Sequence, residues 1–250
     1  MSRLRIVTLS LFAVFAVSAV GATAAQAIKG PYYKVEGVRL KAGESNEIIN
    51  ATAVANFVLA NATTGVKVTC TTINLNAAAK ITGSSGFNNS GSVETITFGG
   101  CTVTGNGTGC TVEGGTVKTE PLVNNLAYAE KPPKKGTKIL VVFEPESGAV
   151  FATIKFVGAG CAVPQLVVEP TNPRGGVCGG AAVKVGEEPA EANVGEINFP
   201  AAPIATAWVE AAGALAEVKC GLASGGTADT LTGLSSFELF GKPNWGIYTT

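Results

Sequence analysis

The six cysteines are the residues of this chain with the clearest chemistry: Cys70, Cys101, Cys110, Cys161, Cys178 and Cys220. Cysteines bind metals, carry out redox reactions or form disulfides. None of the six stands in a Cys-x-x-Cys motif, the spacing that favours metal or redox sites, and their number is even. In an exported chain this pattern predicts disulfides. A zinc site built from four of the thiolates is the alternative.

One short segment contains two of these cysteines. Residues 101 to 115 read CTVTGNGTGCTVEGG, with Cys-Thr-Val printed twice. Asn106-Gly107 between two β-branched segments is a strong hairpin signal, because both residues accept a positive φ. We therefore predict a hairpin clipped by a Cys101–Cys110 disulfide, which would stabilise the fold by about 2 to 3 kcal/mol. The remaining cysteines then pair either as Cys161 with Cys178 and Cys70 with Cys220, or as Cys70 with Cys161 and Cys178 with Cys220.

The composition of the chain excludes several classes of catalytic site. The chain contains no histidine, and Asp229 is its only aspartate. Ser-His-Asp units, Cys-His units and His-containing zinc sites are therefore excluded. No Walker-type motif is present, and no dinucleotide-binding glycine motif. We expect no cofactor, no metal dependence and no catalytic activity.

Two closely spaced pairs of carboxylates are the remaining candidates for acid-base chemistry. They are Glu144 with Glu146, and Glu187 with Glu188. Glycoside hydrolysis needs two carboxyl groups that face each other across a cleft. Because a proline separates the first pair and no motif surrounds the second, we expect solvated turns at both places.

Aromatic residues near the two ends of the chain are candidates for a carbohydrate-stacking platform. They are Tyr32, Tyr33, Trp208, Trp245 and Tyr248. Exposed aromatic faces bind sugars and other ligands. Burial in the core or at a sheet edge is the more common fate of such residues, and it is our expectation here.

Export is predicted by the N-terminus. Arg3 and Arg5 precede an apolar stretch, residues 6–20, and Ala25-Gln26-Ala27 fits a signal-peptidase site. The stretch is short for a membrane span and has no stop-transfer pattern after it. We therefore expect a signal peptide over residues 1–27 and a mature chain without a transmembrane segment, located outside the cell or in the cell envelope.

The mature chain has nearly balanced charge. Without Arg3 and Arg5, 18 − 2 = 16 basic residues stand against 18 acidic ones, a formal charge of −2. The chain therefore has no excess of positive charge that would attract nucleic acid or an anionic membrane. Because only 14% of the chain is charged, against roughly 25% in an average soluble protein, its surface must consist largely of small and uncharged polar residues.

Short β-branched segments between turn residues dominate the rest of the chain. Strands are expected at residues 66–70, 93–98, 138–143 and 150–157. Between Ile204 and Ala216 we expect a hairpin that turns at Ala211-Ala212-Gly213, with a helix interrupted by Gly213 as the alternative. The many turn residues, with 32 glycines and 12 prolines, are typical of an antiparallel sandwich or barrel. We predict an all-β fold, specifically a disulfide-linked antiparallel β-sandwich of jelly-roll or Greek-key type. Residues 28–250 would form one secreted domain, with a subdivision near 186–203 as the alternative.

Several of these segments carry a family resemblance. They are Val68-Thr69-Cys70, Ile96 to Val103, Gly109 to Val112, and Val117 to Leu122. Over roughly residues 64–185 the chain resembles a group of exported, β-rich, cysteine-containing proteins of soil actinobacteria. That group has no assigned activity, so the resemblance implies a secreted all-β protein and transfers no functional residues.

Together these features predict a structural or binding protein of the cell envelope or exterior, without catalytic activity. Its expected partners are cell-wall or envelope components, or further copies of itself through exposed strand edges. The alternative is an extracellular carbohydrate-binding module or a Glu-dependent glycoside hydrolase. A pore-forming barrel would need segments of about ten alternating residues, and only isolated stretches of the chain alternate in this way.

Overall fold

The computed structural model describes residues 30–75, 79–83, 90–93, 95–172, 175–187, 191–211 and 214–249. Within these ranges the chain is all-β, as predicted, and its only helical element is a short 3-10 turn, η1 (Glu113–Gly115). The expected signal peptide lies outside the described residues. Three of the four predicted single strands are present at nearly the expected positions.

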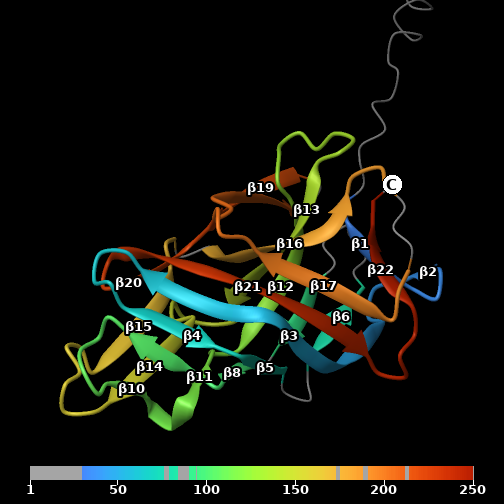
Figure 1. Cartoon of the computed structure of the whole chain (residues 1–250). Helices are drawn as coiled ribbons and strands as arrows, with labels where there is room; N and C mark the ends of the chain where they lie inside the picture. Colours follow the sequence, from blue (N-terminus) through green and yellow to red (C-terminus); the bar gives the residue numbers. More distant parts are fainter. Residues whose placement is uncertain are drawn as a thin grey trace, which may run out of the picture.

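Two long strands run side by side across the middle of the molecule (Figure 1). They are β3 (Ser45–Asn61) and β21 (Thr227–Leu239), which pair antiparallel from Asn61 opposite Asp229 to Ile48 opposite Leu239. We call this pair the central ribbon. Its two halves carry different neighbouring strands, so the ribbon belongs to two parts of the molecule at once.

Around one half of the central ribbon, eight strands pair in succession and return to the first. All of these pairs are antiparallel. We call this ring the cavity barrel. It consists of β3, β6 (Lys80–Thr82), β7 (Ser90–Val93), β12 (Leu122–Tyr128), β13 (Lys138–Pro145), β16 (Gly175–Lys184), β17 (Val194–Phe199) and β21.

A three-stranded sheet packs against the cavity barrel beside β17 (Figure 1). We call it the cover sheet, with the strand order β2 (Val38–Arg39), β1 (Tyr32–Val35) and β22 (Trp245–Tyr248). It is joined to the barrel by a backbone bridge in which Ala192 and Trp245 each donate one N–H to the carbonyl oxygen of the other.

A second, five-stranded closed barrel shares three strands with the first. We call it the small barrel, and it consists of β12, β13, β16, β19 (Ala214–Cys220) and β18 (Thr206–Ala211). β18 and β19 pair antiparallel, which confirms the predicted hairpin between Ile204 and Ala216; its turn at 212–213 lies outside the described residues. The interior of this barrel is a separate hydrophobic core that includes Leu140, Val142 and Val209.

The shared wall explains the continuous apolar sequence of β13. Ile139, Val141 and Phe143 belong to the core that faces the cavity barrel, whereas Leu140 and Val142 belong to the core of the small barrel. Side chains of a strand alternate between its two faces. Because both faces of β13 are buried, every position from 139 to 143 is apolar, as in other strands that are covered on both sides.

The other half of the central ribbon belongs to a region that we call the cysteine lobe. Its strands are β4 (Lys67–Cys70), β5 (Thr72–Leu75), β8 (Ile96–Gly99), β9 (Thr102–Thr104), β10 (Thr111–Val112), β11 (Thr116–Lys118), β14 (Ala152–Val157), β15 (Gln165–Pro170) and β20 (Leu222–Ser224). The single strand expected at residues 93–98 is divided, because β7 ends at Val93 in the cavity barrel and β8 begins at Ile96 in another sheet.

The more specific prediction of a jelly-roll or Greek-key sandwich is not confirmed. A sandwich consists of two open sheets that pack face to face. Here β12, β13 and β16 have partners on both edges and close the small barrel. No local property of these strands distinguishes the two arrangements, since both use alternating inward and outward residues.

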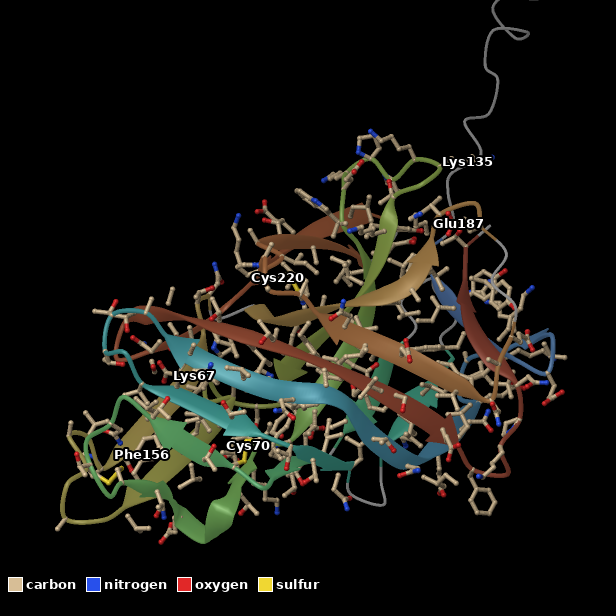
Figure 2. The ribbon with its side chains drawn as sticks, in the orientation of Figure 1. Lys67, Cys70, Lys135, Phe156, Glu187 and Cys220 are labelled. Atoms are coloured by element: carbon tan, nitrogen blue, oxygen red, sulfur yellow. A yellow bond between two sulfur atoms is a disulfide. The ribbon has the colours of Figure 1, made fainter. Side chains whose placement is uncertain are left out.

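All six cysteines form disulfides, as predicted, but the predicted Cys101–Cys110 bridge is wrong. The bridges are Cys70–Cys101, Cys110–Cys161 and Cys178–Cys220. Strand register explains the first, because Thr69 pairs with Thr102 and Cys70 therefore stands opposite Cys101. Of the expected pairs, only Cys178–Cys220 is present. A Cys70–Cys220 bridge is ruled out by the fold, since the two residues lie in different regions (Figure 2).

The predicted hairpin at residues 101–112 is also absent. β9 pairs with β4, and β10 pairs with β14. Asn106 does not act as a simple turn residue: its Oδ1 accepts from the Val163 N–H at 2.9 Å and its Nδ2 donates to the Val163 carbonyl at 3.0 Å. Gly107, at φ +96°, lies so close to residue 160 that a Cβ would stand 1.8 Å from its carbonyl oxygen. The glycines therefore allow two loops to pack backbone against backbone.

Candidate functional site

The main candidate site is a cavity of about 350 Å³ inside the cavity barrel. Seven of the eight strands of this ring contribute to its wall, through side chains such as Ile48, Ile81, Val141, Ile197 and Phe237. The volume lies at the lower end of the range of small-molecule sites, roughly 300 to 1,000 Å³. The wall is predominantly apolar, as such sites usually are.

The cover sheet supplies another part of this wall. Tyr33, Trp245 and Ile247 face the cavity. Their neighbours Tyr32 and Tyr248 stack on each other with ring centroids 6.2 Å apart. Successive side chains of a strand point to opposite faces of the sheet. Tyr33 and Trp245 therefore face the cavity, whereas Tyr32 and Tyr248 pack on each other on the opposite face.

The aromatic residues singled out in the sequence therefore form no shared platform. Tyr32 and Tyr248 are 6% and 8% exposed, and cationic side chains cover their rings: Arg39 lies over Tyr32 at 4.6 Å, and Lys34 over Tyr248 at 4.1 Å. Trp208 lies elsewhere, on the small barrel, beneath the ammonium group of Lys131. Burial, the expected fate, is what the structure shows for all but the half-buried Trp208.

A carboxylate connects the cover sheet to the chain before β17. Glu191 accepts hydrogen bonds from the Gly37 N–H at 2.8 and 3.0 Å and from the Tyr248 hydroxyl at 3.2 Å. Together with the backbone bridge at Ala192, these bonds attach β1 and β22 to the rim of the cavity barrel. The wall formed by Tyr33 and Trp245 is thereby held in place.

Among the described residues, three that line the cavity have uncharged side-chain groups that can form hydrogen bonds: Tyr33, Asn124 and Trp245. Among the described residues, neither Asn124 Oδ1 nor Trp245 Nε1 has a hydrogen-bond partner, although both atoms are buried. Burial raises the pKa of Tyr33, which keeps its side chain the neutral phenol. The wall thus combines an apolar surface with uncharged donors and acceptors.

Glycines position two of these polar side chains. The indole of Trp245 lies against Gly195, where a Cβ would stand 2.3 Å from the ring. The amide of Asn124 lies against Gly91, where a Cβ would stand 2.6 Å from Nδ2. Because glycine has no side chain, the amide of Asn124 packs directly on the backbone of β7, and the indole of Trp245 packs directly on the backbone of β17.

The opening of the cavity lies beside β16 and β17. These strands pair only at Gly180 with Asn198 and at Ala181 with Ile197. Beyond this short ladder, the cavity is lined by exposed residues, among them Val194 and Glu196. Within the described residues, Glu196 is the only charged residue that lines the cavity, and its position is on the exposed face of β17 rather than in the interior.

The first candidate carboxylate pair does not share a cavity, since Glu144 lines one that does not include Glu146. Glu146 is exposed; Glu187 is exposed, forms an ion pair with Lys184 and lies near Lys135 (Figure 2). Glu188 lies outside the described residues. Glu144 is half-buried, and burial raises its pKa.

Glu144 instead shares a separate cavity of about 180 Å³ with Glu169. Sequence reasoning missed this pair because the two residues come from β13 and β15, which are not neighbours in the sequence or in any sheet. Each glutamate is the last-but-one residue of its strand and precedes a proline, a local pattern that does not by itself indicate that the two meet.

The only aspartate is part of a buried hydrogen-bond network in the cysteine lobe. Asn61 Nδ2 donates to Asp229 Oδ1 at 2.8 Å, and the Ser224 hydroxyl donates to the same oxygen at 3.0 Å. Asp229 Oδ2 has no partner among the described residues, and desolvation raises the pKa of this carboxyl. Asn61 and Asp229 face each other at one end of the central ribbon, so the network joins β3 to β21.

Neither metal ligation nor a membrane-spanning helix is seen in the described part of the chain. No group of three or more Cys, Asp or Glu residues there could hold a metal ion, and every cysteine is in a disulfide. None of its helical segments is long and apolar enough to cross a membrane.

Comparison with known proteins adds no relative. No protein-family model matches the chain, no curated protein matches it, and no solved structure matches it. The geometry of the cavity therefore has to support any functional conclusion by itself.

Proposed function

We propose that the mature chain is a secreted or cell-envelope protein that binds a small, mostly apolar molecule in the cavity barrel. The observation that supports this function most strongly is the cavity of about 350 Å³, with an apolar wall built from strands far apart in the sequence. Well-packed interiors contain few voids larger than a water molecule. A cavity of this size, with an opening between strands, is typical of a ligand site.

The disulfides are consistent with export of such a binding protein. Three bridges among six cysteines are typical of proteins that function in oxidising surroundings. The N-terminal sequence, with its Ala25-Gln26-Ala27 cleavage pattern, supports the same location. In this proposal the cavity ligand is the main partner of the protein.

A neutral hydrophobic dye tests the proposed function. N-phenyl-1-naphthylamine becomes fluorescent in apolar surroundings, and we expect the mature chain to bind it saturably, with one dye per chain. Ala181→Phe places a ring in the cavity and should abolish the signal. Ala201→Phe, at an exposed position between β17 and β18, is the matched control and should leave it unchanged. No saturable binding, or equal binding by both variants, would refute the proposal.

A second function has one observation in its favour. Glu144 and Glu169 line one cavity, and burial raises the pKa of Glu144, as the general acid of a glycoside hydrolase requires. Release of reducing ends from cell-wall polysaccharide, lost in Glu144→Gln and in Glu169→Gln but retained in Glu146→Gln, would support this alternative. Activity that survives in all three variants would rule out this site.

A further inference from the structure

The polar groups of the cavity wall narrow the chemical class of the ligand, and this inference rests on the proposed function. Asn124 Oδ1 and Trp245 Nε1 are buried and have no hydrogen-bond partner among the described residues. Nearly all buried polar atoms in native proteins are paired. Since both side chains line the cavity, a polar group of the ligand is the natural partner for them.

The two side chains are held in place rather than free to turn away. The Trp245 indole packs on the backbone of Gly195, and the Asn124 amide packs on that of Gly91. Trp245 is 8% exposed and Asn124 is 4% exposed. Their polar groups are therefore fixed parts of the wall.

The charges of the residues that line the cavity favour a neutral ligand over a charged one. No lysine or arginine lines the cavity within the described residues, and Glu196, the one charged residue among them that does, is on the exposed face of β17. Burying an ionised group without a counter-ion is strongly unfavourable. A carboxylate or phosphate ligand would find no cation inside the cavity.

We infer that the ligand is an uncharged, mostly apolar molecule with one hydroxyl group, which hydrogen-bonds to Asn124 and Trp245. A hydroxyl donates to Asn124 Oδ1 and accepts from the Trp245 N–H. A carbonyl could accept from the indole but would leave Asn124 Oδ1 without a donor. Sugars fit poorly, because the many hydroxyl groups of a sugar exceed the polar groups of the wall.

Four probes with one carbon skeleton test this inference: decane, decanol, decanone and decanoate. Each competes with N-phenyl-1-naphthylamine for the mature chain at pH 7. We expect decanol and decanone to bind, and decanoate to bind at least tenfold more weakly than decanol. Asn124→Leu and Trp245→Phe each remove one polar group. In each variant, the affinity ratio of decanol to decane should fall by about three- to tenfold, the effect of one hydrogen bond.

The outcomes separate this inference from the proposed function. If the dye and all four probes fail to bind, the proposed function itself is wrong. If decane binds and the decanol-to-decane ratio is unchanged in both variants, the cavity binds ligands but the assigned polar contacts are wrong. If decanoate binds more tightly than decanol, the restriction to uncharged ligands is overturned. Phe237→Leu alters the apolar wall and should affect decane and decanol equally, which provides the control.

Discussion

The cysteine lobe and the cavity barrel share the central ribbon, but they are stabilised in different ways. The lobe contains two disulfides, Cys70–Cys101 and Cys110–Cys161, and its interior holds a cavity of only about 40 Å³. The cavity barrel encloses about 350 Å³, and the Cys178–Cys220 bridge lies in the core of the neighbouring small barrel. Covalent links and dense packing are therefore concentrated away from the site.

This contrast shows how a barrel can keep an internal cavity. The small barrel packs behind β13, where Leu140 and Val142 fill its core. On the other side, aromatic rings connect the wall to the lobe: Phe143 packs on Phe199, Phe199 on Phe57, and Phe57 on Phe98. The small barrel thus supports this wall from outside, whereas the aromatic rings pack between the interior of the cavity barrel and the lobe.

Loss of the disulfides of the lobe should have the largest effect. Replacing both Cys110 and Cys161 by serine opens a loop with a sequence separation of 51, and replacing Cys70 and Cys101 opens one of 31. Each double substitution should lower the free energy of unfolding by about 4 kcal/mol in the chain-entropy model. Chemical denaturation measures this loss, and dye binding to the folded variants should be unchanged. A peptide map without reduction that linked Cys101 to Cys110 would contradict the assigned bridges.

Removal of the Asn106 side chain should have the next largest effect. The residue is 1% exposed and forms two hydrogen bonds with the backbone of Val163. Asn106→Ala leaves these backbone groups without partners and should cost about 2 to 3 kcal/mol of stability. Asn74→Ala, at an exposed position of β5, is the control and should change stability by less than about 0.5 kcal/mol. Equal effects of the two substitutions would show that the contact between the loops is unimportant.

Enlarging one alanine in each region compares their packing directly. Ala152 is 3% exposed in the dense core of the lobe, and Ala152→Leu should destabilise the protein by about 1 to 3 kcal/mol through overpacking. Ala181 lines the large cavity, and Ala181→Leu should change stability by less than about 1 kcal/mol while weakening dye binding. Thermal unfolding and dye titration measure the two effects. Equal destabilisation by both changes would mean that the cavity is not available space.

The smallest effect should be a pH dependence that comes from the lobe. Desolvation raises the pKa of Asp229 above its ordinary value of 3.8. A raised pKa in the folded state means that the folded chain binds the proton more tightly, so this contribution is complete below about pH 3.8 and is lost as the pH rises through the folded-state pKa. Asp229→Asn keeps an oxygen for Asn61 and should flatten this part of the stability profile, measured by denaturation between pH 3 and pH 7. An unchanged profile would show that Asp229 is not the group responsible.

Much of the strand content could be predicted from local patterns. The apolar run from Ile139 to Phe143 marked a fully buried strand, and the residues around Ala211 marked a hairpin, because both signals depend on neighbours in the sequence. The cavity could not be predicted in this way. Tyr33, Asn124 and Trp245 come from three strands separated by long stretches of chain, and nothing in the residues around Asn124 distinguishes it from a polar residue at a sheet surface.

The disulfide pattern shows the same limit. The even number of cysteines in the chain, without Cys-x-x-Cys spacing, was sufficient to predict disulfides. Which cysteines pair with each other depends on the register of the strands. Asn106-Gly107 has the composition of a tight turn, yet the amide of Asn106 bonds to Val163 and the glycine permits contact with residue 160. The same residues satisfy either role, so a local rule could not choose between them.

By itself, the sequence determined that this protein is all-β, that its cysteines form disulfides, and that histidine-dependent chemistry is excluded, because these properties follow from residue types and from periodicity along one strand. Tertiary structure alone decided which cysteines are linked, that the strands close into barrels, and that Asn124 and Trp245 meet at one cavity. The physical reason is that strand pairing joins segments such as β3 and β21, which are separated by most of the chain, and the register of those pairs depends on the packing of the whole fold.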